Sequence, residues 1–440
     1  MKILHVGNIA NNALNSAKLL IERGHECHVA CFDFYHFAGC SEWHDAGDGI
    51  SQQQLGSQDF PNFWRLGTSR PAVPFWFAQG PQIRVLTYLG YLVSNQRRLA
   101  TIAGSCLAYA RFRVTIARDT MGDRLPWTEA EYQQAITGLD LTERDRAELD
   151  AGRMYERIAQ QVYTALKRMM PTEDAERFSL PFSRDLLEAI AQRDAGVRRL
   201  LDMFPAGGLL CAIGVELDAG RLLEGPTPRD AGAGDVVHYQ MCLGSWRWLF
   251  RQYDAVICYG AAAILAYLAG VPYLAYEHGT LRDVPFEDSP QGRLVSQAFV
   301  NAARVFVTNN DYLTQDRQLA IKPERIVCLP HAFDERPLRR VLAERGRHHP
   351  GVVTFCCPAR QDWRRQDSIL AKNNHFIVLA ARRLKDLGIS NFRVIFVEWG
   401  ADLTATKALI SSLDLDGHFV WVPPMSKRQL WASYLESHAV

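Results

Sequence analysis

Short apolar runs alternate with amphipathic stretches from the first residues of the chain. KILHVGN has the pattern of a buried strand, and HECHVACF has the pattern of another. Between them, ALNSAKLLIER places Leu14, Ala17, Leu20 and Ile21 on one face of a helix. A strand, a helix and a parallel strand form a right-handed crossover of the doubly wound α/β type.

The same alternation returns after residue 235. YDAVICYG, VPYLAYEHG, RVFVTNN and RIVCLPHAFD are predicted strands, with a helix around LVSQAFVNAA. The uncharged run 255–276 is long enough to span a bilayer, but Gly260, Gly270 and Pro272 divide it. We therefore predict a strand, a short helix and a second strand there, and a first domain that covers residues 1–335.

A second regular series begins at residue 351. GVVTFCCPA, FRVIFVEWG and HFVWVPP are predicted strands, separated by the helices NNHFIVLAARRLKDLG and TATKALISSL and followed by SKRQLWASYLES. The final HAV has the pattern of the first residues of a fourth strand. The segment 335–351 is polar and basic without a strand pattern, so we predict an interdomain connection. Residues 351–440 are expected to form an incomplete second doubly wound domain.

The middle of the chain differs from both series. Residues 58–114 are rich in aromatic and basic side chains, which fits either core and loop or a surface that contacts a membrane or a lipid-linked acceptor. Residues 128–230 are highly charged and have helical patterns. The sequence predicts a helical insertion at about 85–230, and the residues of that insertion indicate no particular chemistry.

The amino-acid composition limits the classes of molecule that the chain is expected to bind and the compartment in which it is expected to work. The 49 basic residues against 48 acidic ones leave no basic excess to attract nucleic acid. The ten cysteines are scattered without a C-x-x-C pair, which is typical of a reduced cytosolic protein. The amino terminus MKILHVGNIA has no signal-peptide pattern. We expect a cytoplasmic location, at the inner face of a membrane if residues 58–114 contact lipid.

One predicted strand ends in an unusual way. YLAY runs directly into Glu277, His278 and Gly279. A histidine at a strand end is most often structural when it is seen alone. Open parallel sheets, however, bind ligands at the carboxyl ends of their strands, so these side chains are also candidate site residues.

Several motifs resemble GT-B glycosyltransferases, and family 4 in particular. AKLLIERGHECHVACF resembles their first helix and second strand, and VCLPHAFDE resembles the end of their acceptor domain. PARQDW with AKNNHFIVLAARRL, and FVWVPPMSKRQLWASYLESHAV, resemble segments of their donor domain. The resemblance covers roughly residues 1–60 and 235–440. It implies two Rossmann-like domains, an acceptor-side domain at 1–335 and a partial donor-binding domain at 351–440.

The chain also departs from the family pattern. His331-Ala332 stands in place of Asn-Gly, and Lys372-Asn373 stands in place of Lys-Gly. Glu398-Trp399-Gly400 replaces Gly-Asp-Gly. The paired glutamates of the family would fall after residue 440, so the donor domain is expected to be truncated.

The resemblance implies transfer of a hexose-like sugar from a nucleotide-sugar to a polysaccharide or glycolipid acceptor. It implies retention of configuration, no metal and no cofactor besides the donor. By the same resemblance His278 donates a hydrogen bond to a donor hydroxyl, and Glu277 is a candidate general base or acceptor contact. The remaining site residues are candidate contacts to the donor phosphates: Arg360, Lys372, Gly7 and Asn8.

Three other functions stay open at this point. A catalytically incomplete nucleotide-binding GT-B protein and a sugar-nucleotide epimerase both fit the same motifs. An NAD-dependent oxidoreductase fits less well, because Gly7 is not part of a G-x-G-x-x-G fingerprint.

Overall fold

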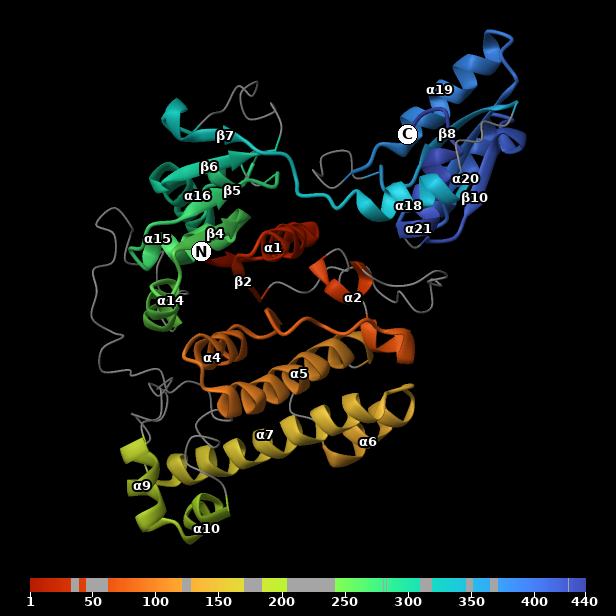
Figure 1. Cartoon of the computed structure of the whole chain (residues 1–440). Helices are drawn as coiled ribbons and strands as arrows, with labels where there is room; N and C mark the ends of the chain where they lie inside the picture. Colours follow the sequence, from red (N-terminus) through yellow and green to blue (C-terminus); the bar gives the residue numbers. More distant parts are fainter. Residues whose placement is uncertain are drawn as a thin grey trace. The chain divides into compact units, whose positions relative to one another are not determined.

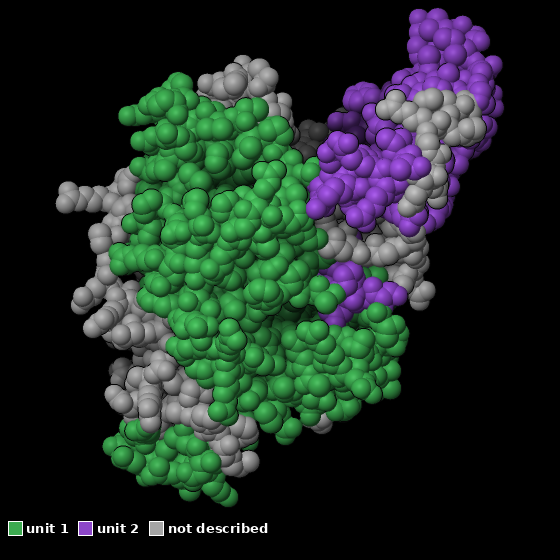
Figure 2. Space-filling model, viewed as in Figure 1, with its two compact units in different colours: residues 1–41, 59–68, 72–333 green, residues 42–58, 69–71, 334–440 purple. Residues whose placement is uncertain are grey.

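The computed structural model describes residues 1–32, 39–44, 62–120, 128–169, 184–203, 242–279, 281, 283–308, 319–345, 351–364, 371–425 and 427–440 (Figure 1). The chain divides into two compact units (Figure 2). Unit 1 comprises Met1–Ser41, Asp59–Thr68 and Ala72–Phe333. Unit 2 comprises Glu42–Gln58, Ser69–Pro71 and Asp334–Val440.

Unit 1 contains a parallel sheet of seven strands in the order β3-β2-β1-β4-β5-β6-β7. The strands are β1 (Lys2–Val6), β2 (Glu26–Cys31), β3 (Phe77–Gln79), β4 (Ala255–Tyr259), β5 (Leu274–Tyr276), β6 (Arg304–Val307) and β7 (Ile326–Cys328). In the register of the sheet centre, Ile3 lies opposite Cys27 on one side and opposite Ala255 on the other. Along the chain, β2 and β3 are added on one side of β1, and β4, β5, β6 and β7 are then added in turn on its other side. The topological switch point, where open α/β sheets bind ligands, is therefore between β1 and β4.

Helices cover both faces of this sheet, which explains why its strands are apolar runs without alternation. They are α1 (Asn12–Glu22), α14 (Leu243–Phe250), α15 (Ala263–Leu268) and α16 (Pro290–Asn301). Leu14 and Ala17 of α1 pack in one core with Val29. Trp246 of α14 and Phe299 of α16 belong to a second, larger core.

The uncharged run 255–276 forms the predicted strand, short helix and strand, namely β4, α15 and β5. Its residues are mostly buried in protein. Among the residues that the structure describes, no helix combines the length and the apolar content needed to cross a bilayer.

A helical part of unit 1 lies between β3 and α14 in the chain. It consists of α4 (Gln82–Val93), α5 (Arg97–Thr120), α6 (Glu129–Thr137), α7 (Glu143–Met169), α9 (Arg184–Arg193) and α10 (Ala195–Met203). Helix α4 packs on α5, and α5 packs on α7 (Figure 1). A Cβ atom at Gly152 of α7 would lie 2.1 Å from the carbonyl oxygen of Ser105 in α5, so the two helices touch through their backbones.

The aromatic stretch 58–114 has both buried rings, which belong to the core, and exposed ones. The rings of Phe63, Trp64 and Phe77 are all buried, whereas Phe75 is 69% exposed. Phe77 lies in β3, an edge strand that the sequence did not predict. The short helix η3 (Phe63–Ser69) contains Phe63 and Trp64, and the short helix α2 (Ser41–His44) comes earlier in the chain.

Unit 2 is built on a parallel sheet of three strands in the order β10-β9-β8. Its strands are β8 (Val353–Cys357), β9 (Phe392–Val397) and β10 (Phe419–Val422), and its helices are α18 (Arg336–Arg345), α19 (Asn374–Asp386), α20 (Leu403–Ser412) and α21 (Lys427–Leu435). Ala439 pairs in parallel with Phe355 on the other side of β8. Chain segments that follow β8 therefore pair on both of its sides, which places the switch point of unit 2 at the carboxyl end of β8.

The predicted strands and helices of both series are present. The chain is an α/β protein with two parallel sheets. The segment 335–351, which we predicted as a connection, contains α18, and α18 packs on α21 within unit 2.

Candidate functional site

The turn between β1 and α1 lies at the switch point of unit 1. Gly7 has a φ of +87°, and a Cβ atom there would lie 3.3 Å from the carbonyl oxygen of Tyr259 at the end of β4. Ala10 and Asn11, in the short helix η1 (Ile9–Asn11), both have left-handed backbones, with φ of 49° and 59°. The turn is therefore tight, and glycine allows it to approach β4 closely.

The side chain of Asn8 holds this turn together. Its Nδ2 donates to Asn11 Oδ1 at 2.8 Å and to the carbonyl oxygen of Gly39 at 2.9 Å. Its Oδ1 accepts a hydrogen bond from the backbone N–H of Leu14 at 3.0 Å, a role that a helix-capping side chain usually has. Both amide hydrogens are used inside the protein, so only the backbone of the turn remains to approach a ligand at Asn8.

Three polar side chains meet beside this turn. Asn12 Nδ2 lies 3.0 Å from His278 Nδ1 and 2.7 Å from His331 Nδ1. The two imidazole rings are 4.6 Å apart in an edge-to-face arrangement. Asn12 is buried at 4% exposure, and His278 is half-buried. We refer to Asn12, His278 and His331 as the imidazole cluster.

The topology explains how residues so distant in sequence come together. Asn12 follows β1, His278 follows β5 and His331 follows β7. Because all the strands are parallel, their carboxyl ends lie along one edge of the sheet. His278 was predicted as a site residue. His331 was noted only where the chain departs from the family pattern, and Asn12 was not predicted.

Tyr276, the last residue of β5, supports His331. The two rings stack at 5.9 Å, and the Tyr276 hydroxyl donates to the carbonyl oxygens of Leu329 and Pro330 at 3.0 and 3.1 Å. Burial, together with the charge of Glu277, raises the pKa of Tyr276 to about 12, so the hydroxyl keeps its proton. His331 itself is exposed, and partial desolvation by its neighbours lowers its pKa, which favours its neutral form.

Glu277 has different surroundings from His278. It is buried at 6% exposure, and its backbone N–H donates to the carbonyl oxygen of Phe306 at 2.8 Å. Its carboxylate accepts a hydrogen bond from the hydroxyl of Thr308 at 3.5 Å. These Glu277 contacts are with β6 and the residue after it, whereas the Asn12 and His331 contacts of His278 involve α1 and the segment after β7.

In unit 2, Arg360 and Lys372 are joined through one residue, Asp362. The Asp362 carboxylate accepts a hydrogen bond from Arg360 Nε at 3.3 Å. The backbone of Asp362 accepts from the N–H of Lys372 at 2.6 Å and donates to Asn374 Oδ1 at 3.2 Å. The loop that follows β8 is therefore fastened to the first turn of α19, where Asn373 has a left-handed backbone. We refer to Arg360, Asp362 and Lys372 as the β8 loop site.

Close packing between two loops requires a glycine at the end of Glu398-Trp399-Gly400. A Cβ atom at Gly400 would lie 2.3 Å from the carbonyl oxygen of Gln361. Gln361 also donates from its backbone N–H to the carbonyl oxygen of Trp399 at 2.9 Å. The loops after β8 and β9 thus pack backbone against backbone, which keeps the β8 loop site in place.

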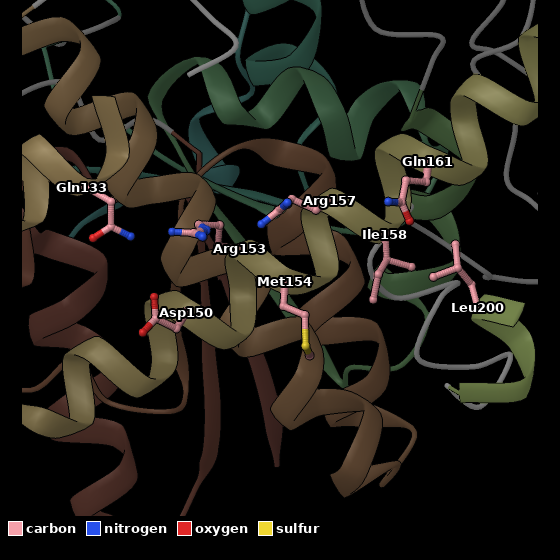
Figure 3. A pocket seen from close by; sticks show the side chains of 8 residues that line it. All are labelled: Gln133, Asp150, Arg153, Met154, Arg157, Ile158, Gln161 and Leu200. Atoms are coloured by element: carbon pink, nitrogen blue, oxygen red, sulfur yellow. The ribbon is translucent and has the colours of Figure 1, made fainter. Parts of the chain in front are cut away.

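A cavity of about 580 Å³ lies in the helical part of unit 1 (Figure 3). Arg153 and Arg157 reach it from adjacent turns of α7, and Asp150 lies on the same helix. The Arg153 guanidinium lies over the Tyr132 ring at 4.3 Å, and the Tyr132 hydroxyl donates to Asp150 at 3.0 Å. Its lining of charged, amide and apolar side chains includes none of the site residues that the sequence predicts.

Within the described ranges, no group of three or more histidine, cysteine, aspartate or glutamate side chains is placed to hold a metal ion. No protein-family model matches the chain, and no curated protein matches it significantly. The functional interpretation of the imidazole cluster and the β8 loop site therefore rests on their geometry and on the motif resemblance.

Proposed function

We propose that this chain is a nucleotide-sugar-dependent glycosyltransferase of the GT-B type. The observation that carries the proposal is the β8 loop site. Arg360 and Lys372 are fastened through Asp362 to the start of α19, at the carboxyl end of β8, where β9 pairs on one side and Ala439 on the other. Such sheets bind nucleotides at this position.

The chemistry of glycosyl transfer accounts for a basic site there. The bond between the anomeric carbon and the diphosphate breaks, and negative charge develops on the departing phosphate oxygens. Arginine, lysine and the N–H groups of a helix amino terminus stabilise that charge. Asp362 holds Arg360 through Nε, and charge-assisted hydrogen bonds from a guanidinium to phosphate are among the strongest in proteins.

In unit 1, His278 donates a hydrogen bond to a hydroxyl of the transferred sugar, as in the family that the motifs resemble. Glu277 contacts the acceptor, whose hydroxyl oxygen forms the new bond to the anomeric carbon and passes its proton to an oxygen of the departing diphosphate. The acceptor class is a polysaccharide or a glycolipid. Configuration is retained, and no metal takes part.

Binding of the donor tests the proposal on the chain as it stands. A calorimetric panel of UDP, GDP and ADP, each beside its nucleoside, is expected to show one diphosphate that binds far more tightly than its nucleoside. In Arg360→Ala, loss of one or two charge-assisted hydrogen bonds at about 1.5–3 kcal/mol each weakens diphosphate binding about tenfold or more. Nucleoside binding is expected to change little.

Arg339→Ala is the matched control. Arg339 lies on α18 in the same unit, and its exposed guanidinium pairs with Glu335, the residue before that helix. It should leave diphosphate affinity unchanged. Equal losses of diphosphate and nucleoside in Arg360→Ala, or no diphosphate binding by the unaltered chain, would refute the proposal.

The products formed from a nucleotide-sugar distinguish the proposed transferase from an epimerase and from a binding protein. Release of nucleoside diphosphate that depends on an added acceptor supports transfer. Conversion of the sugar within an intact donor supports an epimerase. Tight diphosphate binding with neither reaction supports a catalytically incomplete binding protein.

A further inference from the structure

We propose that the carboxylate of Glu398 accepts hydrogen bonds from the ribose hydroxyls of a nucleotide whose phosphates lie at the β8 loop site. This role rests on the proposed function, because it needs a nucleotide at that site. It makes Glu398 a specificity-determining residue, through which the chain selects ribonucleotides over deoxyribonucleotides.

Glu398 is the first residue after β9, the strand that follows β8 in the chain and pairs with it in the sheet. Cys357 of β8 lies opposite Phe396 of β9 in the register of these parallel strands. Arg360 comes three residues after Cys357, and Glu398 comes two residues after Phe396. Arg360 and Glu398 therefore follow neighbouring strands at the same carboxyl edge of the sheet.

Doubly wound nucleotide-binding sheets place a ribose contact at this point. The phosphates lie at the turn after the first strand, and an acid further along the chain binds a ribose hydroxyl. In unit 2, β8 is the first strand and β9 the second, so Glu398 has the place of that acid. The family that the motifs resemble has glycine there, which has no side chain for such a contact. The departure from Gly-Asp-Gly thus gives this chain a group that could read the ribose.

Backbone contacts fix the position of Glu398. Its N–H donates to the carbonyl oxygen of Val422, the last residue of β10, at 2.7 Å. The residues that follow it, Trp399 and Gly400, pack backbone against backbone on Gln361 of the loop after β8. Glu398 is therefore held in a constant position relative to the β8 loop site.

Lys407 of α20 makes this carboxylate compatible with a nearby diphosphate. The Lys407 ammonium forms an ion pair with Oε1 of Glu398 and lies 5.2 Å from the centre of the Trp421 ring. Its positive charge offsets the repulsion between the carboxylate and the phosphates. The two oxygens of a carboxylate have about four lone-pair sites, so Glu398 can accept from hydroxyls while it is paired with Lys407. The Glu398 side chain is 43% exposed, which leaves it within reach of a ligand.

Calorimetry with sugar-modified nucleotides tests this role. The ribonucleoside diphosphate that the unaltered chain binds most tightly is compared with its 2′-deoxy and 3′-deoxy analogues. Loss of one charge-assisted hydrogen bond should weaken the binding of at least one analogue about tenfold. In Glu398→Ala the ratio of ribonucleotide to deoxynucleotide affinity should fall to about one. Glu398→Gln retains a neutral acceptor and should give an intermediate ratio.

Asp386→Ala is the matched control. Asp386 pairs with Arg382 on α19, and these side chains are 41% and 42% exposed, close to the values for Glu398 and Lys407. Its removal should leave the ratio of affinities at the value of the unaltered chain. The affinity of Glu398→Ala for the deoxynucleotide should not decrease, because the lost carboxylate made no bond to that ligand and repelled its phosphates.

The outcomes distinguish this role from the proposed function. Equal affinities for the ribonucleotide and both analogues in the unaltered chain would overturn the role of Glu398 and leave the proposed function standing. So would an unchanged ratio in Glu398→Ala, and Glu398 would then form a surface ion pair only. Absence of binding by every nucleoside diphosphate would overturn both. If Glu398→Ala does not fold, Glu398→Gln provides the comparison, and an unchanged ratio there has the same meaning.

Discussion

The stability of unit 1 is expected to decrease in mild acid because of two buried histidines in its central strands. His5 of β1 is completely buried, and its Nδ1 lies 2.9 Å from the hydroxyl of Tyr259. Burial lowers the pKa of His5 from the usual 6.5 to about 3. His28 of β2 lies 3.1 Å from the hydroxyl of Tyr253, and burial is the main cause that lowers its pKa to about 4.

The sign of the effect follows from proton binding in the two states. Below pH 6.5 the unfolded chain binds a proton at each histidine, whereas the folded chain does not until the pH approaches 4 or 3. The free energy of unfolding therefore decreases as the pH falls from 6.5. At about 1.36 kcal/mol per pH unit, His5 should contribute a loss of about 2 kcal/mol between pH 7 and pH 5, and His28 nearly the same.

Urea unfolding at pH 7, 6 and 5 measures this loss. His5→Gln replaces the imidazole with a group that does not titrate, and it is expected to reduce the pH-dependent loss by about 2 kcal/mol. The absolute stability of this variant will also change, so the comparison is between slopes. If the variant and the unaltered chain lose the same free energy between pH 7 and pH 5, the reasoning is wrong. Carbon-13 NMR of the imidazole should also show His5 unprotonated at pH 5.

Substitutions at three positions test the close backbone contacts at Gly400 and Gly152 and the strained backbone at Ala10. Gly400→Ala places a methyl group 2.3 Å from the carbonyl oxygen of Gln361, so unit 2 should lose about 1–3 kcal/mol or more in urea unfolding, and an unchanged midpoint would contradict the packing described. Gly152→Ala meets the carbonyl oxygen of Ser105 at 2.1 Å, and amide exchange in α5 and α7 should speed up because the helices must separate. Ala10→Gly removes a Cβ atom from a residue with a left-handed backbone and so relieves local strain. The melting temperature of this variant should stay level or increase, which corresponds to a gain of up to about 1 kcal/mol in the free energy of unfolding. A clear decrease in that melting temperature would mean that the turn is not strained.

The sequence predicts the fold well where burial leaves a regular pattern. The parallel strands are covered on both faces, so they are short apolar runs that are easy to recognise. Strand β3 was missed because its three residues lie in an aromatic stretch without a clear period. Helix α18 was missed because half of the residues in RPLRRVLAER are charged, and Leu338, Val341 and Leu342 mark only a short apolar face.

The candidate site was harder to predict, for a spatial reason. His278 has a local signal, the abrupt polar end of an apolar strand. Asn12 is 266 residues from His278 and 319 residues from His331, and no spacing in the chain reveals that they meet. Asn8 follows a strand and a glycine, as a ligand contact would, yet its amide serves the turn. Such roles depend on hydrogen bonds between residues that the sequence does not pair.

The strand order of unit 1 also has a consequence for synthesis and folding. Strand β1 pairs with β2 through a short local crossover, but its other neighbour, β4, follows about 250 residues later in the chain. At ribosomal rates of about 5–20 residues per second, roughly 10–50 s pass before β4 is available. During that time the central strand has an unpaired apolar edge, the kind of edge that recruits other chains. The long helical part, if it folds first, shortens the effective loop that β4 must close and so lowers the entropic cost of completing the sheet.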